Sequence, residues 1–265
     1  MNAELLIMFT LVCDRAHLYA HPERELTIHE TQRYDDALAR RATGTPAQYI
    51  TGHQEFWGLD LIVSPAVLIP RPETEHVVEA VLELAKADGR GPSPHHLCIV
   101  DVGTGSGAIA LALAKELPSA EIHATDISLE ALEVARANAA RHGLTSRIEF
   151  HQADLLDGLS PSSFDFVVSN PPYVGESEED SVQLEVRKFE PRNAVFAGPT
   201  GLEVIERLIP QAHGALRSGG WLVFEISGTI ADRVRGLLAS WGEVEIRNDL
   251  QGIARVAIAR KSTNG

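Results

Sequence analysis

The sequence has little cysteine, little basic charge and no long apolar run. Its two cysteines, Cys13 and Cys98, form no Cys-x-x-Cys pair, which excludes a disulfide scaffold and argues against a metal site. The 37 acidic side chains outnumber the 23 basic ones, and the net charge of −14 disfavours tight binding to nucleic acid. No stretch has the roughly 20 apolar residues that a membrane span needs. We therefore expect a cytoplasmic protein that binds neither membranes nor nucleic acid directly.

Two types of hydrophobic pattern follow each other along the chain. Apolar residues recur at helical spacing in residues 5–13, Pro22 interrupts this pattern, and Thr27 is the expected N-cap of a second helix. Residues 49–63 instead suggest a β-hairpin, and three prolines between positions 65 and 72 suggest a stiff connector. The N-terminal part is therefore expected to be helical and joined to the rest by a hairpin.

From Leu97 onward, short apolar runs alternate with helical segments, which predicts a mainly parallel sheet covered on both faces. The strands expected at residues 244–247 and 254–259 have no helix between them, so one of them should run antiparallel. Gly89–Pro94 is rich in glycine and proline and is expected to be a surface loop. The predicted class is α/β.

A glycine-rich loop follows the first strand of this part and suggests a cofactor site. Its Gly-x-Gly-x-x-Ala pattern suits NAD or S-adenosylmethionine, and Asp126 at the end of the next strand can bind ribose hydroxyls. The loop carries no positive charge for a pyrophosphate, and Asp101 can bind loop amides or a methionine ammonium group, which favours S-adenosylmethionine. Asp154 and Leu155 follow the third strand and are expected beside the adenine. The predicted cofactor-binding residues are Asp101, Gly103, Thr104, Gly105, Ser106, Gly107, Asp126, Asp154, Leu155 and Asn170.

The sequence Asn-Pro-Pro-Tyr at residues 170–173 follows the strand expected at residues 164–168 and suggests a reaction site. The Asn170 side-chain oxygen and the Pro171 carbonyl can accept the two hydrogens of a planar nitrogen and stabilise the charge that develops there during methylation. Tyr173 can stack on the planar group. We therefore predict Asn170 and Pro171 as catalytic residues, and Asn170, Pro171, Pro172 and Tyr173 as substrate-binding residues.

Four further segments resemble the release-factor glutamine methyltransferase family (HemK/PrmC type). They are Gly-Thr-Pro-Ala-Gln-Tyr-Ile-Thr-Gly at residues 44–52, Glu-Phe-Trp-Gly at 55–58, Leu-Ile-Pro-Arg-Pro-Glu-Thr-Glu at 68–75, and Phe-Glu-Pro-Arg at 189–192. The resemblance implies S-adenosyl-L-methionine as cofactor and methylation of the side-chain nitrogen (N5) of the Gly-Gly-Gln glutamine in peptide chain release factors. It also implies a Rossmann-like, seven-stranded, mainly parallel sheet. The expected domains are a helical, release-factor-docking domain (1–46), a β-hairpin linker (47–72) and a methyltransferase domain (73–265), and we expect a monomer.

The chain departs from this family in two places. Ser227 and Ile230 stand where the family usually has glycine and glutamine after the position of Glu225, and the N-terminus begins partway through the family's first helices. Three alternatives remain open at this point. An adenine-amino (N6) methyltransferase of DNA or RNA also uses Asn-Pro-Pro-Tyr, but the acidic charge and the lack of a Lys/Arg cluster disfavour it. The others are a nicotinamide-dependent oxidoreductase and a release-factor-binding module without catalysis.

Overall fold

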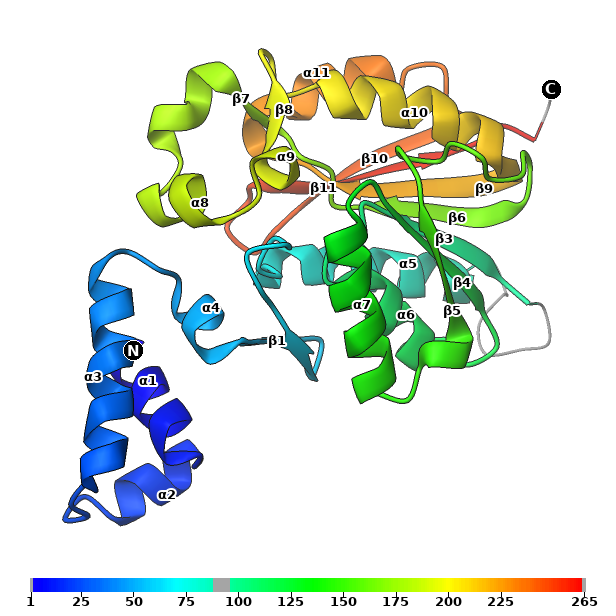
Figure 1. The fold of residues 1–265 in the computed structure, drawn as a ribbon. Coiled ribbons are helices and arrows are strands. Elements are labelled where there is room, and N and C mark those ends of the chain that lie inside the picture. The colour runs from blue at the N-terminus through cyan, green and yellow to red at the C-terminus, as the bar shows by residue number, and fades with distance from the viewer. Residues whose placement is uncertain (1, 88–95, 264–265) are drawn as a thin grey trace.

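A computed structural model describes residues 2–87 and 96–263, so the loop predicted at Gly89–Pro94 lies outside the described residues. A seven-stranded sheet with helices on both faces forms the largest part, and a group of helices stands beside it at the N-terminus (Figure 1). This architecture confirms the predicted α/β class and the mainly parallel, Rossmann-like sheet. Within the described ranges, no helix combines the length and the apolar character needed to cross a membrane.

The sheet has the strand order β10-β11-β9-β6-β3-β4-β5. Strand β11 pairs antiparallel with both β9 and β10, and the other pairings in the sheet are parallel, as the missing helix between the last two strands predicts. The strands are β3 (Cys98–Val102), β4 (Glu121–Asp126), β5 (Ile148–Gln152), β6 (Phe164–Ser169), β9 (Leu216–Glu225), β10 (Glu243–Asn248) and β11 (Ala254–Arg260).

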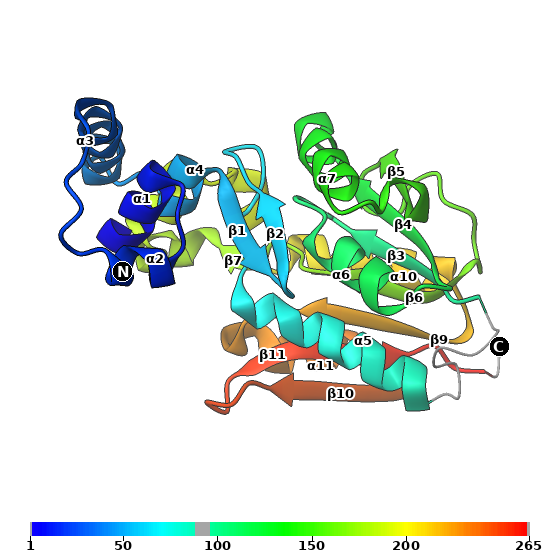
Figure 2. The same ribbon diagram turned by 90° about the horizontal axis from the view of Figure 1, so that it is seen from below.

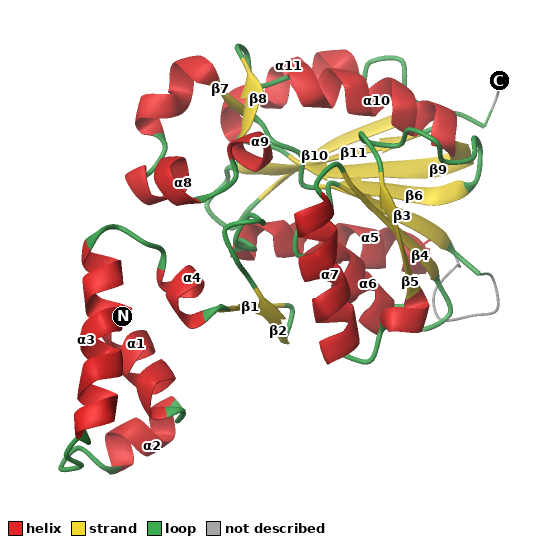
Figure 3. Ribbon diagram, in the orientation of Figure 1, coloured by secondary structure: helices red, strands yellow, loops and turns green. Residues whose placement is uncertain are grey.

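Helices cover the two faces of this sheet (Figure 3). They bury a separate apolar cluster on each face. All five residues of the central strand β3 are buried, because helices pack against it from both sides. One face carries α5 (Glu75–Ala87), α6 (Ala108–Glu116) and α7 (Leu129–Arg141), and the other carries α10 (Glu203–Ala215) and α11 (Ala231–Leu237). Because the helices cover the faces of the sheet, the edge formed by the carboxyl ends of the parallel strands is left to the connecting loops.

The N-terminal helices form a small cluster of their own around the buried residues Leu6, Ala37 and Ile50. As predicted, Thr27 caps a helix, in a capping box in which Thr27 and Glu30 each bind the other's backbone N–H. The first helix ends earlier than the expected break at Pro22, because Val12 adopts a left-handed backbone with φ of 53°. The helices are α1 (Asn2–Leu11), α2 (Arg15–Ala20), α3 (Ile28–Ala42) and α4 (Ala47–Thr51).

A hairpin of β1 (His53–Phe56) and β2 (Leu59–Ile62) lies between these helices and the sheet (Figure 2). The predicted hairpin was wrong at its start, because residues 49–51 belong to α4. The side chain of Asn138 on α7 holds the hairpin. It accepts from the Ile62 N–H at 2.7 Å and donates to the Ile62 carbonyl at 3.0 Å. The hairpin is thereby tied to the helix that follows β4.

Residues 174–198 form a segment over the carboxyl edge that the sequence patterns do not predict in detail. It touches the N-terminal helices, where Arg41 pairs with Glu185 at 2.9 Å and Lys188 donates to the Thr43 carbonyl at 3.3 Å. The elements of the segment are β7 (Val174–Gly175), a 3-10 helix (Glu176–Ser181), α8 (Leu184–Phe189), α9 (Arg192–Val195) and β8 (Phe196–Gly198).

Candidate active site

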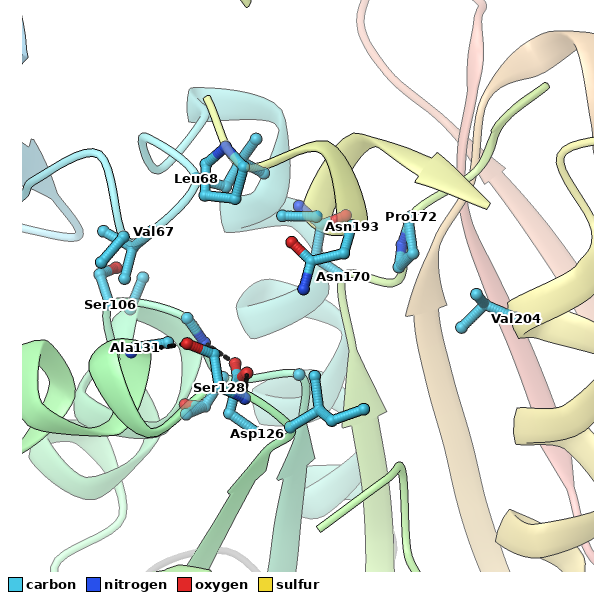
Figure 4. Close-up of a pocket in the computed structure, with 18 of the residues that line it drawn as sticks. Val67, Leu68, Ser106, Asp126, Ser128, Ala131, Asn170, Pro172, Asn193 and Val204 are labelled. Atoms are coloured by element: carbon cyan, nitrogen blue, oxygen red, sulfur yellow. Dashed lines mark hydrogen bonds between the residues drawn. The ribbon is translucent and has the colours of Figure 1, made fainter. Parts of the chain in front are cut away.

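A cavity of about 520 Å³ lies over the carboxyl ends of β3, β4 and β6. This is the place where open α/β sheets bind their ligands, and the volume suits a small organic cofactor. Six stretches of chain line it, namely the connector at residues 65–74, the glycine loop with the start of α6, the acidic turn after β4, and residues 153–155, 170–172 and 191–207. Figure 4 shows Asn170 and Pro172 facing Asp126 and Ser128 across this space.

The glycine loop forms the floor of the cavity. Gly103 and Gly105 have φ of 70° and 55°, and a Cβ atom at either position would have no protein atom within 4 Å. Their backbone can therefore adopt the turn and leave room for a ligand. The N–H groups of Gly103 and Thr104 both donate to the Thr125 carbonyl at 2.9 Å, and the Gly105 N–H donates to Asp126. Because these donors are used within the protein, the loop does not form a pyrophosphate cradle.

Two residues predicted to bind the cofactor lie behind the loop and do not line the cavity. Asp101 is buried, and its Oδ2 accepts the Thr104 hydroxyl at 2.6 Å and the Ala110 N–H at 3.2 Å. Burial in this apolar setting raises the pKa of Asp101 to about 7. Gly107 is the N-cap of α6 with φ of 85°. Both residues therefore shape the loop from behind, whereas Thr104 and Ser106 line the cavity.

The acidic turn after β4 forms one wall. Asp126 accepts the Gly105 N–H through Oδ2 and the Ser128 N–H through Oδ1, each at 2.9 Å, which fixes the plane of the carboxylate. Burial raises the pKa of Asp126, and the two hydrogen bonds oppose this shift. Ile127 lines the cavity with 58% of its surface exposed, an apolar contact that the sequence analysis missed. An exposed isoleucine beside a polar wall suits a flat apolar ring.

Asp154 and Leu155, which the sequence analysis places beside the adenine, line the cavity beyond this wall. Leu155 has a left-handed backbone with φ of 56°, and its carbonyl accepts the Thr125 hydroxyl at 2.8 Å. Asp154 forms an ion pair with Arg207 at 2.5 Å. Arg207 also lines the cavity, and because Asp154 neutralises it, the charge that remains in the lining is acidic, from Asp126 and Glu130. Such a lining suits a cationic ligand.

The Asn-Pro-Pro-Tyr residues lie between this cavity and a smaller one of about 140 Å³. Asn170 and Pro172 line both cavities, whereas Pro171 and Tyr173 line only the smaller one. All four residues therefore line the smaller cavity, and Asn170 and Pro172 lie at the junction of the two. A group held in the smaller cavity would meet a ligand of the larger cavity beside Asn170.

A buried hydrogen-bond network orients Asn170 from behind. The Asn170 Nδ2 donates to the Thr74 hydroxyl at 3.0 Å, and the Thr74 hydroxyl donates to Glu225 Oε2 at 2.5 Å. The Tyr173 hydroxyl donates to Glu225 Oε1 at 2.9 Å. Since a carboxylate only accepts, the single Thr74 proton goes to Glu225, and the Thr74 oxygen must accept from an N–H group. The Asn170 amide therefore turns its NH₂ group to Thr74 and its Oδ1 away from it.

Thr74 and Glu225, like Ile127, are site residues to which the sequence analysis assigned no role. Both are buried, at 4% and 1% exposure, and 151 residues separate them in the chain. Burial raises the pKa of Glu225, whereas the hydrogen bonds from Thr74 and Tyr173 lower it. Burial and the Glu225 charge also raise the pKa of Tyr173, so its hydroxyl stays protonated as a donor. The sequence held one indication of a role for Thr74, namely its position within residues 68–75, a segment that resembles the family.

The connector is fastened over the cavity by contacts at both of its ends. Arg71 donates to Glu190 Oε1 at 2.6 Å, and Glu190 Oε2 accepts the Ile69 N–H at 3.2 Å. The Tyr49 hydroxyl donates to the Val67 carbonyl at 2.6 Å. Figure 4 shows Val67 and Leu68 on the side of the cavity opposite Val204. These hydrogen bonds thus fix the connector in place as one wall of the cavity.

Comparisons with known proteins agree with this geometry. Models of the methyltransferase small domain and the PrmC N-terminal domain match residues 91–188 and 1–52. A release factor glutamine methyltransferase of Koribacter versatilis is 55% identical over 265 residues, which cover 100% of this chain and 92% of the relative. Its counterpart in Chlorobaculum tepidum is 43% identical, with 96% and 88% covered. A solved methyltransferase of Pyrococcus furiosus shares the fold at 20% identity, with a TM-score of 0.55 over 88% of this chain and 99% of that one. The chain belongs to the release factor glutamine methyltransferase family.

Proposed function

We propose that this enzyme transfers a methyl group from S-adenosyl-L-methionine to the side-chain amide nitrogen (N5) of the Gly-Gly-Gln glutamine in peptide chain release factors. The observation that carries the proposal is the orientation of Asn170 at the junction of the two cavities. No donor in the described part of the chain reaches its Oδ1, so this oxygen is available to a substrate N–H group. A carboxamide NH₂ is a donor of the matching kind.

The larger cavity fits S-adenosylmethionine. The proposed binding residues are Gly103, Thr104, Gly105 and Ser106 below it, Asp126 for the ribose hydroxyls, and Asp154, Leu155 and Ile127 around the adenine. The acidic lining favours a cation, and the loop amides are not available for a pyrophosphate, which disfavours a nicotinamide dinucleotide. When bound, the sulfonium supplies an electrophilic methyl group. Asp101 and Gly107 support the loop from behind.

The chain's own residues explain how a weakly nucleophilic amide can react. The Asn170 Oδ1 and the Pro171 carbonyl are proposed to accept the two N–H groups of the glutamine, which orients the nitrogen and stabilises the positive charge developing on it. Pro172 and Tyr173 line the smaller cavity and are proposed to hold the planar carboxamide. No strong base is needed, because the methylated nitrogen is acidic enough to lose its proton late in the reaction.

The proposed division of the chain follows this chemistry. Residues 1–46 are proposed to dock the release factor, residues 47–72 to link the two domains, and residues 73–265 to bind the cofactor and catalyse transfer. The ion pair between Arg41 and Glu185 supports this division, since it joins the N-terminal helices to the segment that covers the smaller cavity. We also propose that the enzyme acts as a cytoplasmic monomer without a direct nucleic-acid partner. The net charge of −14 supports the last point.

A competition assay separates this function from methylation of adenine. The enzyme is incubated with labelled S-adenosylmethionine, a release factor, and an excess of double- and single-stranded DNA and RNA. We expect label in the release factor alone, and none in a factor whose Gly-Gly-Gln glutamine is replaced by alanine. Label in adenine, with an unlabelled release factor, would refute the proposal.

A further inference from the structure

Two histidines and two glutamates form a cluster on strands β4 and β5, outside both cavities. Glu121 and His123 are two residues apart in β4, and Glu149 and His151 are two residues apart in β5, so each pair faces one side of the sheet. In the parallel ladder His123 lies opposite Glu149. Since β5 is the last strand in the sheet order, the cluster joins an edge strand to its only neighbour in the sheet.

Three potential ligand groups of this cluster converge on one point. The His123 Nδ1 lies 3.2 Å from the His151 Nε2. The Glu149 Oε2 lies 3.6 Å from the His123 Nδ1, and the Glu149 Oε1 lies 3.5 Å from the His151 Nε2. A tetrahedral ion with ligands at about 2.0–2.2 Å has ligand–ligand distances of about 3.3–3.6 Å. The three groups thus already have nearly the spacing of one face of a zinc coordination sphere.

A fourth residue prepares His123 for this role. The His123 Nε2 lies 3.1 Å from Glu121 Oε1, and because a carboxylate only accepts, the proton of the neutral ring is on Nε2. The Nδ1 lone pair then points toward His151 and Glu149. A carboxylate that holds the outer N–H of a ligating histidine is a regular feature of zinc sites, where it fixes the tautomer and raises the basicity of the ligand.

The imidazole rings are also held in place by packing. The His123 ring meets the buried Phe164 ring edge-on at 5.3 Å. It lies edge to edge with the His151 ring, with the centroids 5.4 Å apart and an interplanar angle of 18°. The side chains of His123, His151 and Glu149 are 14%, 28% and 64% exposed, so the site is rigid on the His123 side and open to solvent on the Glu149 side. Solvent can supply the remaining ligand.

The nearby thiol belongs to a separate group of side chains. Cys98 is buried and lies close to Glu121 and His123, but it is not part of the group that His123 forms with Glu149 and His151.

We propose that His123, His151 and Glu149 bind a divalent transition-metal ion of the zinc class, with Glu121 orienting His123 and water completing the coordination. The site uses imidazole and carboxylate ligands, so the scarcity of cysteine that argued against a metal site does not bear on it. Its effect is to clamp the edge strand β5 to β4, and it is independent of methyl transfer.

Zinc binding to the full, untagged chain tests this proposal. Competition with a zinc-sensitive dye is expected to show one ion bound per chain in the wild type. His151→Gln is expected to weaken affinity at least tenfold, and Glu121→Gln by about tenfold, which is the usual effect of losing an orienting partner. His76→Gln is the matched control, because His76 also pairs with a glutamate, Glu79 at 2.9 Å, but has no second histidine beside it among the described residues.

Cobalt substitution gives a second readout that does not depend on the dye. Tetrahedral ligand-field bands that are present in the wild type and in His76→Gln, but absent in His151→Gln, would support the site. Each variant should keep the wild-type circular dichroism spectrum, and Glu149→Gln replaces any variant that does not. The proposal is overturned if the wild type binds no zinc at micromolar concentrations, or if His151→Gln and His76→Gln bind it equally well.

Discussion

Replacing Thr74 by valine should uncouple the orientation of Asn170 from the rest of the site. Valine has nearly the same shape, but it removes the acceptor of the Asn170 NH₂ group and a donor to Glu225. Free flipping of the amide would cost about twofold in rate, since half of the molecules would present the wrong atom. A shift of the Asn170 Oδ1 away from the substrate nitrogen costs more, because misplacing a reacting group by about 1 Å can lower the rate about 100-fold. We therefore expect kcat to fall by about 10- to 100-fold.

The same change should lower stability by a predictable amount. One lost hydrogen bond is to a carboxylate, worth about 1.5–3 kcal/mol, and one is to a neutral amide, worth about 1 kcal/mol. A loss of about 2.5–4 kcal/mol lowers the Tm of a chain of this size by roughly 5–16 °C. The rate is therefore measured well below the Tm, with saturating cofactor and release factor. Mass spectrometry of the factor follows the reaction over time.

Two control variants separate orientation from stability. Thr74→Ser keeps the hydroxyl and should retain kcat within about threefold. Thr10→Val removes another buried threonine hydroxyl, which donates to the Leu6 carbonyl at 2.9 Å in the N-terminal helices, and should lower stability while leaving kcat unchanged. A folded Thr74→Val enzyme with kcat within about twofold of the wild type would refute the reasoning, as would a Thr74→Ser enzyme that is equally impaired.

Three further substitutions have distinct expected outcomes. Asn170→Ala should bind the cofactor normally in calorimetry while losing about 100- to 1,000-fold in turnover, and an equal loss of affinity would contradict its assigned role. Asp126→Asn should weaken cofactor binding about 10- to 100-fold, because the amide has only one acceptor oxygen for the two backbone donors and the ribose, and an unchanged Kd would contradict this. Asp101→Asn tests the raised pKa of about 7. Because the pKa of Asp101 is higher in the folded protein than in the unfolded chain, its protonated form favours folding. This contribution to stability is fully present below about pH 4 and is lost as the pH rises through about 7. The wild type should therefore lose stability relative to Asp101→Asn between about pH 4 and pH 7 in urea unfolding, and parallel pH profiles would argue against the shift.

The parts of the fold that follow from local pattern were predictable from the sequence. Thr27 caps its helix, and Asp126 ends its strand, because these features depend on neighbours a few residues away. The helix stop at Val12 was missed, since it comes from a left-handed backbone at a β-branched residue, which is rare. The start of the hairpin was misplaced for a related reason, because residues 49–51 are apolar enough for either a strand or a helix.

The site was predictable in its motifs and not in its orientation. The glycine loop and Asn-Pro-Pro-Tyr are short patterns whose chemistry can be read directly. The contact between Thr74 and Glu225 joins positions 151 residues apart, and only the packing of the connector against β9 brings them together. Asp101 was assigned to the cavity, but within the fully buried strand β3 its side chain points behind the loop and binds Thr104. Side-chain direction at a strand end depends on the pleat and on the helix packed above it.

The central claim is that the glutamine side chain of Gly-Gly-Gln receives the methyl group and that Asn170 positions it. Fragment-ion mass spectrometry of a release factor treated with wild-type enzyme tests this most directly. The account predicts a single methyl group on that glutamine side chain with the wild type, and almost none with Asn170→Ala at equal cofactor saturation. A methyl group on another residue, or equal methylation by Asn170→Ala, would contradict it.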